Sequence, residues 1–244
     1  MRRIALFSDI HGNLAALETV LADVDACGIE ERYCLGDLVG YGPDPAGVID
    51  RMRASGIPTV LGNYDDGIGN RRGECGCYYA TLLARSDGAA SYMFTETRVD
   101  DDRSAWLAAL AHELRLEHGG HRVLLVHGSP RKVNEYLLAD RTDEQLVRLA
   151  EAADADIVCV GHVHSPYRRT MTGTGGARID YVSVGSVGKP KDGDSRACWA
   201  ELRLGDDGQV DAVFHRVAYD MDAVASQMRA AGLPETLIVA LRDA

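Results

Sequence analysis

The most constraining feature of this sequence is an alternation of short apolar runs with amphipathic stretches over its first 160 residues. The run from Ile4 to Phe7 predicts a β-strand, and apolar residues at helical spacing between 14 and 24 predict the helix after it. Repeated units of this kind build mostly parallel sheets with helices on the outside. The alternation therefore predicts an α/β fold.

After Gly161 the pattern changes to short alternating runs separated by turn sequences rich in Gly and Asp. Such runs predict antiparallel strands joined by turns. Two amphipathic stretches, 220–231 and 234–242, predict closing helices. Because no linker or repeat interrupts the chain, we expect one domain over residues 1–244. It should have a parallel half and an antiparallel half in two packed sheets, with helices outside.

Finer expectations concern the middle of the chain. Residues 58–61 predict a strand, and residues 62–76, rich in Gly, Asn and Asp, predict a long loop of the kind that carries function. Helices are expected at about 87–98 and 103–112. The loop contains the close pair Cys75 and Cys77, for which the alternatives are a metal or redox role and incidental loop chemistry.

The charge balance limits the partners of this protein. Against 26 Lys and Arg stand 37 Asp and Glu, a net charge of −11, whereas proteins that bind long nucleic acids or anionic membranes need a basic face. No apolar run is long enough for a signal peptide or a membrane span. Six cysteines are too sparse for a disulfide framework. We therefore expect a soluble, cytoplasmic protein, either monomeric or a homo-oligomer.

Polar side chains stand directly after the predicted strands, at the carboxyl ends where α/β folds assemble their sites. They are two Asp, one Asn and four His, with no Cys among them: Asp9, His11, Asp37, Asn63, His127, His162 and His164. A single Asp or His after a strand is usually a turn or packing residue, but five such clusters together indicate a metal site. Oxygen and imidazole ligands suit divalent Mn, Fe, Co, Ni or Zn. They differ from the cysteine ligands of a thiolate zinc site.

Seven ligands exceed the needs of one tetrahedral metal. If one Asp bridges, they form two sets of four, as expected for two divalent ions about 3.5–4 Å apart. Four positive charges against two carboxylates leave a net positive site that attracts an anion and lowers the pKa of a bridging water. The residues thus predict hydrolysis of a small phosphoester by a hydroxide that bridges the metals.

The order of these motifs resembles that of the calcineurin-like metallophosphoesterase superfamily, and the segments 129–131 and 185–194 resemble its small bacterial and archaeal phosphodiesterase-like branch. The resemblance spans residues 4 to about 200 and implies a four-layer αββα sandwich, with two mixed β-sheets flanked by helices. It also implies two divalent ions, manganese being favoured. One ion would be held by Asp9, His11 and His164, the other by Asn63, His127 and His162, with Asp37 bridging.

One position departs from the resemblance. The superfamily usually carries Gly-Asn-His before an acidic residue, and that histidine stabilises the transition state or protonates the leaving group; this chain has Gly62-Asn63-Tyr64-Asp65. A phenol with a pKa near 10 is a poor general acid at neutral pH. We therefore expect a phosphodiesterase in which Asn63 and Asp37 are catalytic and Tyr64 at most orients the substrate.

Other functions remain as alternatives. A phosphomonoesterase acting on a nucleotide or a phosphoprotein would share the same site, and a non-catalytic interaction module would share the fold. The segment 184–188 lacks the first glycine of a serine-hydrolase elbow, and neither a phosphate-binding P-loop nor a dinucleotide fingerprint is present. Arg131 and Lys189 flank the motif loops and are candidate phosphate contacts, although basic loop residues are commonly just solvated.

Overall fold

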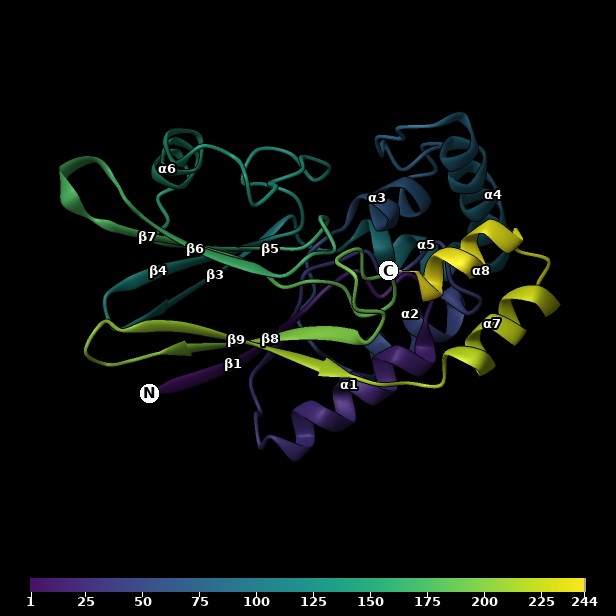
Figure 1. Ribbon diagram of the computed structural model, residues 1–244, viewed down its shortest axis with the longest axis horizontal. Helices are drawn as coiled ribbons and strands as arrows, with labels where there is room; N and C mark the ends of the chain where they lie inside the picture. Colours follow the sequence, from purple (N-terminus) through teal and green to yellow (C-terminus); the bar gives the residue numbers. More distant parts are fainter. Residues whose placement is uncertain (244) are drawn as a thin grey trace.

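The computed structural model describes residues 1–243. Two mixed β-sheets lie face to face, with helices covering both outer surfaces (Figure 1). The strands are β1 (Arg2–Phe7), β2 (Arg32–Cys34), β3 (Glu113–His118), β4 (His121–Val126), β5 (Ile157–Val160), β6 (Tyr167–Thr172), β7 (Arg178–Ser183), β8 (Ala197–Leu204) and β9 (Val210–Val217). The helices are α1 (Leu14–Ala26), α2 (Pro45–Ser55), α3 (Asn63–Gly69), α4 (Leu82–Arg98), α5 (Asp101–Ala108), α6 (Asp143–Ala152), α7 (Met221–Ala230) and α8 (Glu235–Arg242).

The two sheets interleave the halves of the chain. One sheet has the strand order β2-β1-β8-β9 and the other β3-β4-β5-β7-β6. In the first, β1 is parallel to β2 and antiparallel to β8, and in the second, β5 is parallel to both β4 and β7. The expectation of two mixed sheets is confirmed. The expectation that the chain divides into a parallel half and an antiparallel half was wrong, because each sheet contains both kinds of strand pair. The reason lies in β8, which is buried along almost its whole length and therefore fits an inner position of the first sheet.

Three apolar cores hold the layers together. Between the sheets, Leu6, Leu202 and Cys159 pack with no exposed surface. Helix α1 covers the outside of the first sheet through residues such as Leu17, and α6 covers the outside of the second through Leu146. The order is helix, sheet, sheet, helix, so the four-layer sandwich is confirmed.

Segment 62–76 differs from the expected long loop because its first part is the helix α3. Asp65 explains this helix: its carboxylate accepts hydrogen bonds from the backbone N–H groups of Gly62 and Leu38, at 3.1 and 2.9 Å. It therefore caps the helix start and ties it to the loop after β2. The glycines of this segment have low helix propensity, so the sequence did not predict a helix here. Gly69 is nevertheless required, because it packs closely on Ala108 of α5 and a larger side chain would not fit.

Other elements in the middle of the chain also differ from the expected ranges. Residues 58–61 form no named strand, only single bridges from Thr59 to Cys34 and from Val60 to Ala111, because Pro58 carries no N–H and α3 begins directly afterwards. Helix α4 begins at Leu82 rather than near 87, since Thr81 caps it, and α5 begins after the cap Asp100 and ends at Ala108. Side-chain capping thus decided where both helices begin.

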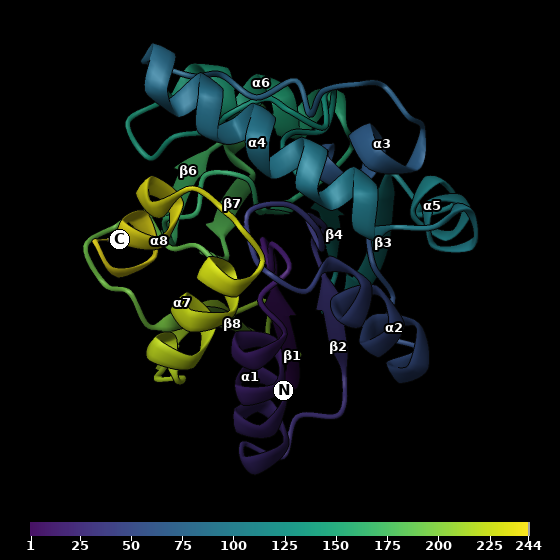
Figure 2. The same cartoon turned by 90° about the vertical axis from the view of Figure 1, so that its right-hand side faces the viewer.

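Helices at one end of the sandwich surround the carboxyl ends of the parallel strands. Seen from that end, α4, α7 and α8 lie around the loops that follow β1 and β2 (Figure 2). The side chain of Thr236 in α8 donates a hydrogen bond to Asp87 in α4, at 2.8 Å, and so joins two of these helices. Within residues 1–243, no helix is both long enough and apolar enough to cross a membrane.

Candidate metal centre

The structure brings all seven predicted ligands to this end of the sheets. Asp9 and His11 follow β1, Asp37 follows β2, His127 follows β4, and the two remaining histidines follow β5. Asn63 is the first residue of α3. None of the seven residues is more than 3% exposed, although all are polar. Such burial of polar groups is costly unless a partner compensates it.

The loops that carry these ligands have an unusual backbone. Five of the seven ligands adopt left-handed φ angles, between 49° and 64°: Asp9, His11, Asp37, His162 and His164. Non-glycine residues rarely take this conformation, which costs about 1–3 kcal/mol each and clusters at functional sites. Close packing holds the loops in place, since a Cβ atom at Gly62 would lie 2.2 Å from Oδ1 of Asp37.

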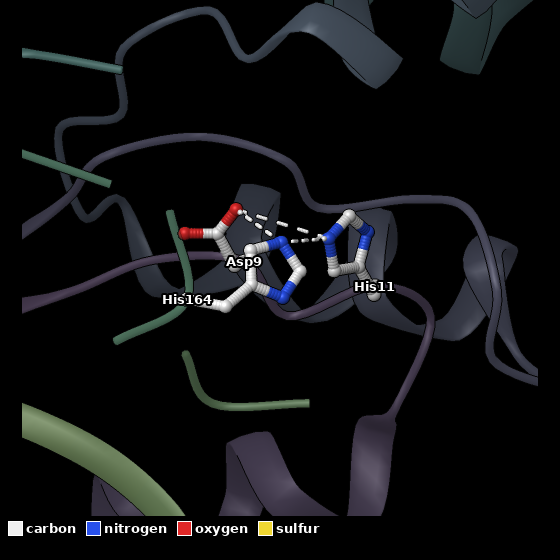
Figure 3. Close-up of side chains that lie close together, drawn as sticks. All are labelled: Asp9, His11 and His164. Atoms are coloured by element: carbon white, nitrogen blue, oxygen red, sulfur yellow. Dashed lines mark hydrogen bonds and ion pairs between the residues drawn. The ribbon is translucent and has the colours of Figure 1, made fainter. Parts of the chain in front are cut away.

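Asp9, His11 and His164 form one group of potential ligands, shown in Figure 3. Their facing atoms are Oδ1 of the carboxylate and Nε2 of each imidazole. The Nε2 atoms are 3.2 Å apart, and Oδ1 lies 3.8 Å from Nε2 of His11 and 3.3 Å from Nε2 of His164. Three donor atoms converging at such distances can hold one divalent ion.

Asp37, His127 and His162 form a second group, with ligand atoms within 4.8 Å of one another. Asn63 adds an amide oxygen, since its Oδ1 lies 3.1 Å from Nε2 of His127. Oδ2 of Asp37 lies 3.5 Å from Nε2 of His127 and 3.8 Å from Nε2 of His11. One carboxylate oxygen of Asp37 is therefore close to both groups.

Backbone carbonyls orient the histidines. Nδ1 of His11 faces the carbonyl of Val39 at 3.0 Å, and Nδ1 of His127 faces that of Leu35 at 2.7 Å. Nδ1 of His164 likewise faces the carbonyl of Lys189. A carbonyl fixes the proton on Nδ1 and leaves Nε2 as the free lone pair, which is how proteins prepare histidines as metal ligands.

Burial separates the protonation states of these groups. It lowers the pKa of His11 and of His162 to about 3, and that of His164 well below its usual range, so all three are neutral. Burial also opposes the charged form of His127, but the adjacent Asp37 carboxylate raises the pKa of His127 to about 9. In the metal-free protein, a proton on His127 thus balances the charge of the buried carboxylates. A divalent cation would displace this proton on binding.

Unsatisfied polar atoms indicate what the site is built to hold. Oδ1 of Asp9 and Nε2 of His162 are buried and have no hydrogen-bond partner among residues 1–243. Both are atoms that ligate divalent metals, and they belong to different groups. Because orphaned buried polar atoms are rare in folded proteins, their presence among oriented imidazoles and carboxylates fits two divalent cations.

A pocket of about 240 Å³ opens over the two groups. Tyrosines form much of its wall. Among them, only Tyr64 is a site residue predicted from the sequence. The ring of Tyr136 lies against that of His162 at a tilt of 32°, with centroids 4.0 Å apart, and the ring of Tyr41 lies 5.0 Å from that of His11. Leu237 of α8 closes another side. For Tyr41, the sequence offers one weak signal of a place in the site, its position between two glycines after the Asp37 motif. For Tyr136, the sequence offers no such signal.

Tyr64 lies in the pocket wall but is fully buried. Its ring packs edge-on to His11 at 5.5 Å, and its hydroxyl has no hydrogen-bond partner within the described part of the chain. Burial raises the pKa of this phenol well above its ordinary value of 10. Tyr64 is therefore a poorer proton donor here than a phenol in water.

The two candidate phosphate contacts separate in the structure. Nζ of Lys189 lies over the ring of Tyr41, 4.9 Å from its centroid, in the wall of the pocket. Burial, together with Lys191, lowers the pKa of Lys189 to about 8, so the ammonium remains mainly charged at neutral pH. Arg131 instead pairs with Glu135, at 2.5 Å, and lines a different hollow. Glu135 thus holds the guanidinium of Arg131 outside the pocket, and a phosphate contact at Arg131 stays a prediction.

Comparisons with known proteins find relatives that cover nearly the whole chain. An uncharacterized protein of Methanocaldococcus jannaschii is 29% identical over 96% of this chain and 95% of its own. A metallophosphoesterase from Sphaerobacter thermophilus has a similar structure, with a TM-score of 0.75, 29% identity and 99% of each chain covered. A hypothetical protein from Pyrococcus horikoshii shares the fold, with a TM-score of 0.82 and 21% identity over 99% of this chain and 98% of its own.

A shorter match concerns the symmetrical bis(5'-nucleosyl)-tetraphosphatase of Acidovorax sp., which is 31% identical over 122 residues, 49% of this chain and 41% of that enzyme. The family model described as the calcineurin-like phosphoesterase superfamily domain matches residues 1–205, which include all seven candidate ligands. This protein therefore belongs to the calcineurin-like phosphoesterase superfamily, a membership that implies hydrolysis of phosphoester bonds in general.

Proposed function

We propose that this protein is a phosphodiesterase that uses two divalent metal ions, with manganese as the favoured metal. The observation that carries the proposal is the position of Asp37, whose Oδ2 lies within 3.8 Å of histidine nitrogens from both ligand groups. A carboxylate shared between two groups of imidazoles is the arrangement that a pair of cations requires.

When bound, the two ions would polarise the phosphoryl oxygens and supply hydroxide at neutral pH. The residues of the chain contribute positioning. Asn63 places its amide oxygen at the second group, where it would help hold the ion that neutralises charge developing on the phosphorus oxygens. Lys189 offers a further positive charge at the pocket wall. Together these groups favour a compact anionic substrate.

Tyr64 favours a diester over a monoester. Its phenol is buried and its pKa is raised, so it cannot efficiently protonate an alkoxide leaving group. A diester with a good leaving group needs no such acid. The tyrosine rings of the pocket wall offer apolar faces on which an aromatic leaving group can stack.

The direct test is hydrolysis of an aromatic phosphodiester by the full-length protein, with added Mn²⁺ and, in parallel, after removal of metal by a chelator. We expect turnover that depends on metal and returns when metal is restored. Metal analysis of the same samples should find two ions per chain. No turnover with any divalent metal, or full turnover after complete metal removal, would refute the proposal; fewer than two ions after reconstitution would favour a binding module.

Tyr64→His tests the basis of the diester preference. A histidine at this position can protonate a leaving group near neutral pH, so the ratio of monoester to diester turnover should rise by about tenfold or more. Matched aromatic mono- and diester substrates measure the ratio, and Tyr64→Phe serves as the control that removes only the hydroxyl. An unchanged ratio in Tyr64→His would mean that the preference has another origin.

Lys189→Ala tests the phosphate contact. Loss of a charge-assisted contact worth about 1.5–3 kcal/mol should raise KM by about tenfold or more. Arg131→Ala is the matched control, since Arg131 is paired with Glu135 outside the pocket, and its KM should stay within twofold, about 0.4 kcal/mol. Equal KM changes in both variants would count against Lys189.

A further inference from the structure

The pair Cys75 and Cys77 lies against the metal centre. Their Sγ atoms are in contact, 2.8 Å apart, with the thiol of Cys75 donating to the sulfur of Cys77. Cys75 is 7% exposed, whereas Cys77 is partly exposed and forms part of the pocket wall. A small reagent that enters the pocket can therefore reach one sulfur whose neighbour is a second thiol.

Both cysteines also hold the side chain of Asn63. Its Nδ2 donates one hydrogen bond to the backbone carbonyl of Cys75, at 2.9 Å, and another to Sγ of Cys77, at 3.1 Å. These two bonds turn the amide so that Oδ1 faces His127. The orientation of one ligand of the second group thus depends on the position and chemical state of the cysteine pair.

We propose that Cys75 and Cys77 form a dithiol modification site for a hydroperoxide, and that their oxidation to a disulfide weakens the metal position that includes Asn63. In the first step a thiol sulfur attacks the peroxide, the O–O bond breaks, a sulfenic acid forms and water leaves. In the second step the other thiol attacks that sulfur, the S–S bond forms and a second water leaves. Two thiols and one hydrogen peroxide thus give one disulfide and two waters.

The local structure permits this bond and keeps it reversible. A disulfide needs its sulfur atoms about 2 Å apart, so the thiols have little distance to close. Gly76, with a φ of 66°, is the only residue between them and lets the backbone adjust without a side chain in the way. Bridging such near neighbours strains the disulfide geometry, and strained disulfides are the easily reduced, regulatory ones.

Oxidation should act on Asn63 through both hydrogen bonds. Disulfide formation moves Sγ of Cys77, which accepts the bond from Nδ2, toward Sγ of Cys75 and so disturbs this contact. The backbone carbonyl of Cys75 moves with the same closure. The amide then loses the contacts that direct Oδ1 to the second group, while Asp9, His11 and His164 keep their own carbonyl and loop supports. One ion position should weaken and the other should persist.

The experiment treats full-length protein with hydrogen peroxide and follows three quantities: intact mass, the cross-linked peptide, and metal content after dialysis. Wild type should lose the mass of two hydrogen atoms, with the bond mapped to Cys75 and Cys77, and should retain fewer ions than the reduced protein. A thiol reductant should restore both quantities. Cys75→Ser should neither form this bond nor change its own metal content with peroxide.

Cys27→Ser is the matched control, because it removes a partly exposed cysteine elsewhere and should respond to peroxide like wild type. Absence of the bond between Cys75 and Cys77, or the bond with unchanged metal content, would overturn the proposal. Mass and metal content require no substrate, so the outcome is independent of whether the protein is a phosphodiesterase.

Discussion

The middles and the carboxyl ends of the same strands are equally buried but contribute in opposite ways. In β1, Leu6 lies between the two sheets with no exposed surface, and three residues later Asp9 is equally inaccessible. Burial of the leucine side chain stabilises the fold by about 1.5–3 kcal/mol. Burial of the aspartate is unfavourable, and it raises the pKa of this carboxyl and leaves its Oδ1 unpartnered.

The difference shows that stability and function are separated along each strand. The inter-sheet core holds the sheets rigidly enough that loops with left-handed backbone can carry polar ligands at their ends. Changes at the ends should therefore affect chemistry far more than folding, and changes in the middle should do the reverse. Substitutions at the metal centre, in the inter-sheet core and on the outer face of a sheet should separate these two effects.

The largest effect is expected for Asp37→Asn. The amide carries no negative charge, so it cannot serve both ligand groups, and kcat/KM for a diester should fall by roughly a thousandfold or more, about 4 kcal/mol. The free energy of unfolding without metal should change by less than about 2 kcal/mol, because no apolar packing is lost. Kinetics and urea unfolding measure the two effects. Asp222→Asn, at an exposed carboxylate of α7, is the control; near-normal turnover in Asp37→Asn would contradict the shared role.

Leu202→Ala should show the opposite pattern. Leu202 lies in the inter-sheet core with no exposed surface, and its truncation should lower the free energy of unfolding by about 2–5 kcal/mol. Below the melting transition, metal content and turnover should remain close to wild type. Leu202→Met, which conserves volume, should cost less than about 1.5 kcal/mol. A large loss of metal binding in folded Leu202→Ala would show that core and site are not separable.

The smallest effect concerns the outer face of the first sheet. Glu201 of β8 is 1% exposed, and hydrogen bonds from Arg203 and Arg3 lower its pKa from 4.5 to about 2. Because the folded value is the lower one, this stabilisation is complete above about pH 4.5 and is lost as the pH falls from 4.5 toward 2.

Glu201→Gln should therefore be less stable than wild type by about 1–2 kcal/mol at pH 7, and the difference should shrink at pH 3. Urea unfolding of both proteins at the two pH values measures it. Metal content at pH 7 should be the same in both. A stability difference that is independent of pH would mean that the carboxylate charge does not contribute.

Much of the fold and site was predictable because the relevant signals are local. Apolar runs marked β1, β5 and β8 whatever their partners, and polar residues after the predicted strands marked the seven side chains that the structure brings together. By contrast, α3 was missed because its glycines oppose helix formation, and it depends on the carboxylate of Asp65 and on packing against α5. Tertiary contacts overrode propensity at that point.

The sequence by itself determined the α/β class and the chemical types of the polar residues that follow its apolar runs, because periodicity and residue chemistry are local properties of the sequence. Only the tertiary structure decided that β8 joins β1, that Asp37 lies between two histidine groups, and that Tyr136 rather than Arg131 faces the pocket. It also decided that Cys75 and Cys77 touch Asn63. These relations join residues through packing and backbone angles that no local pattern encodes.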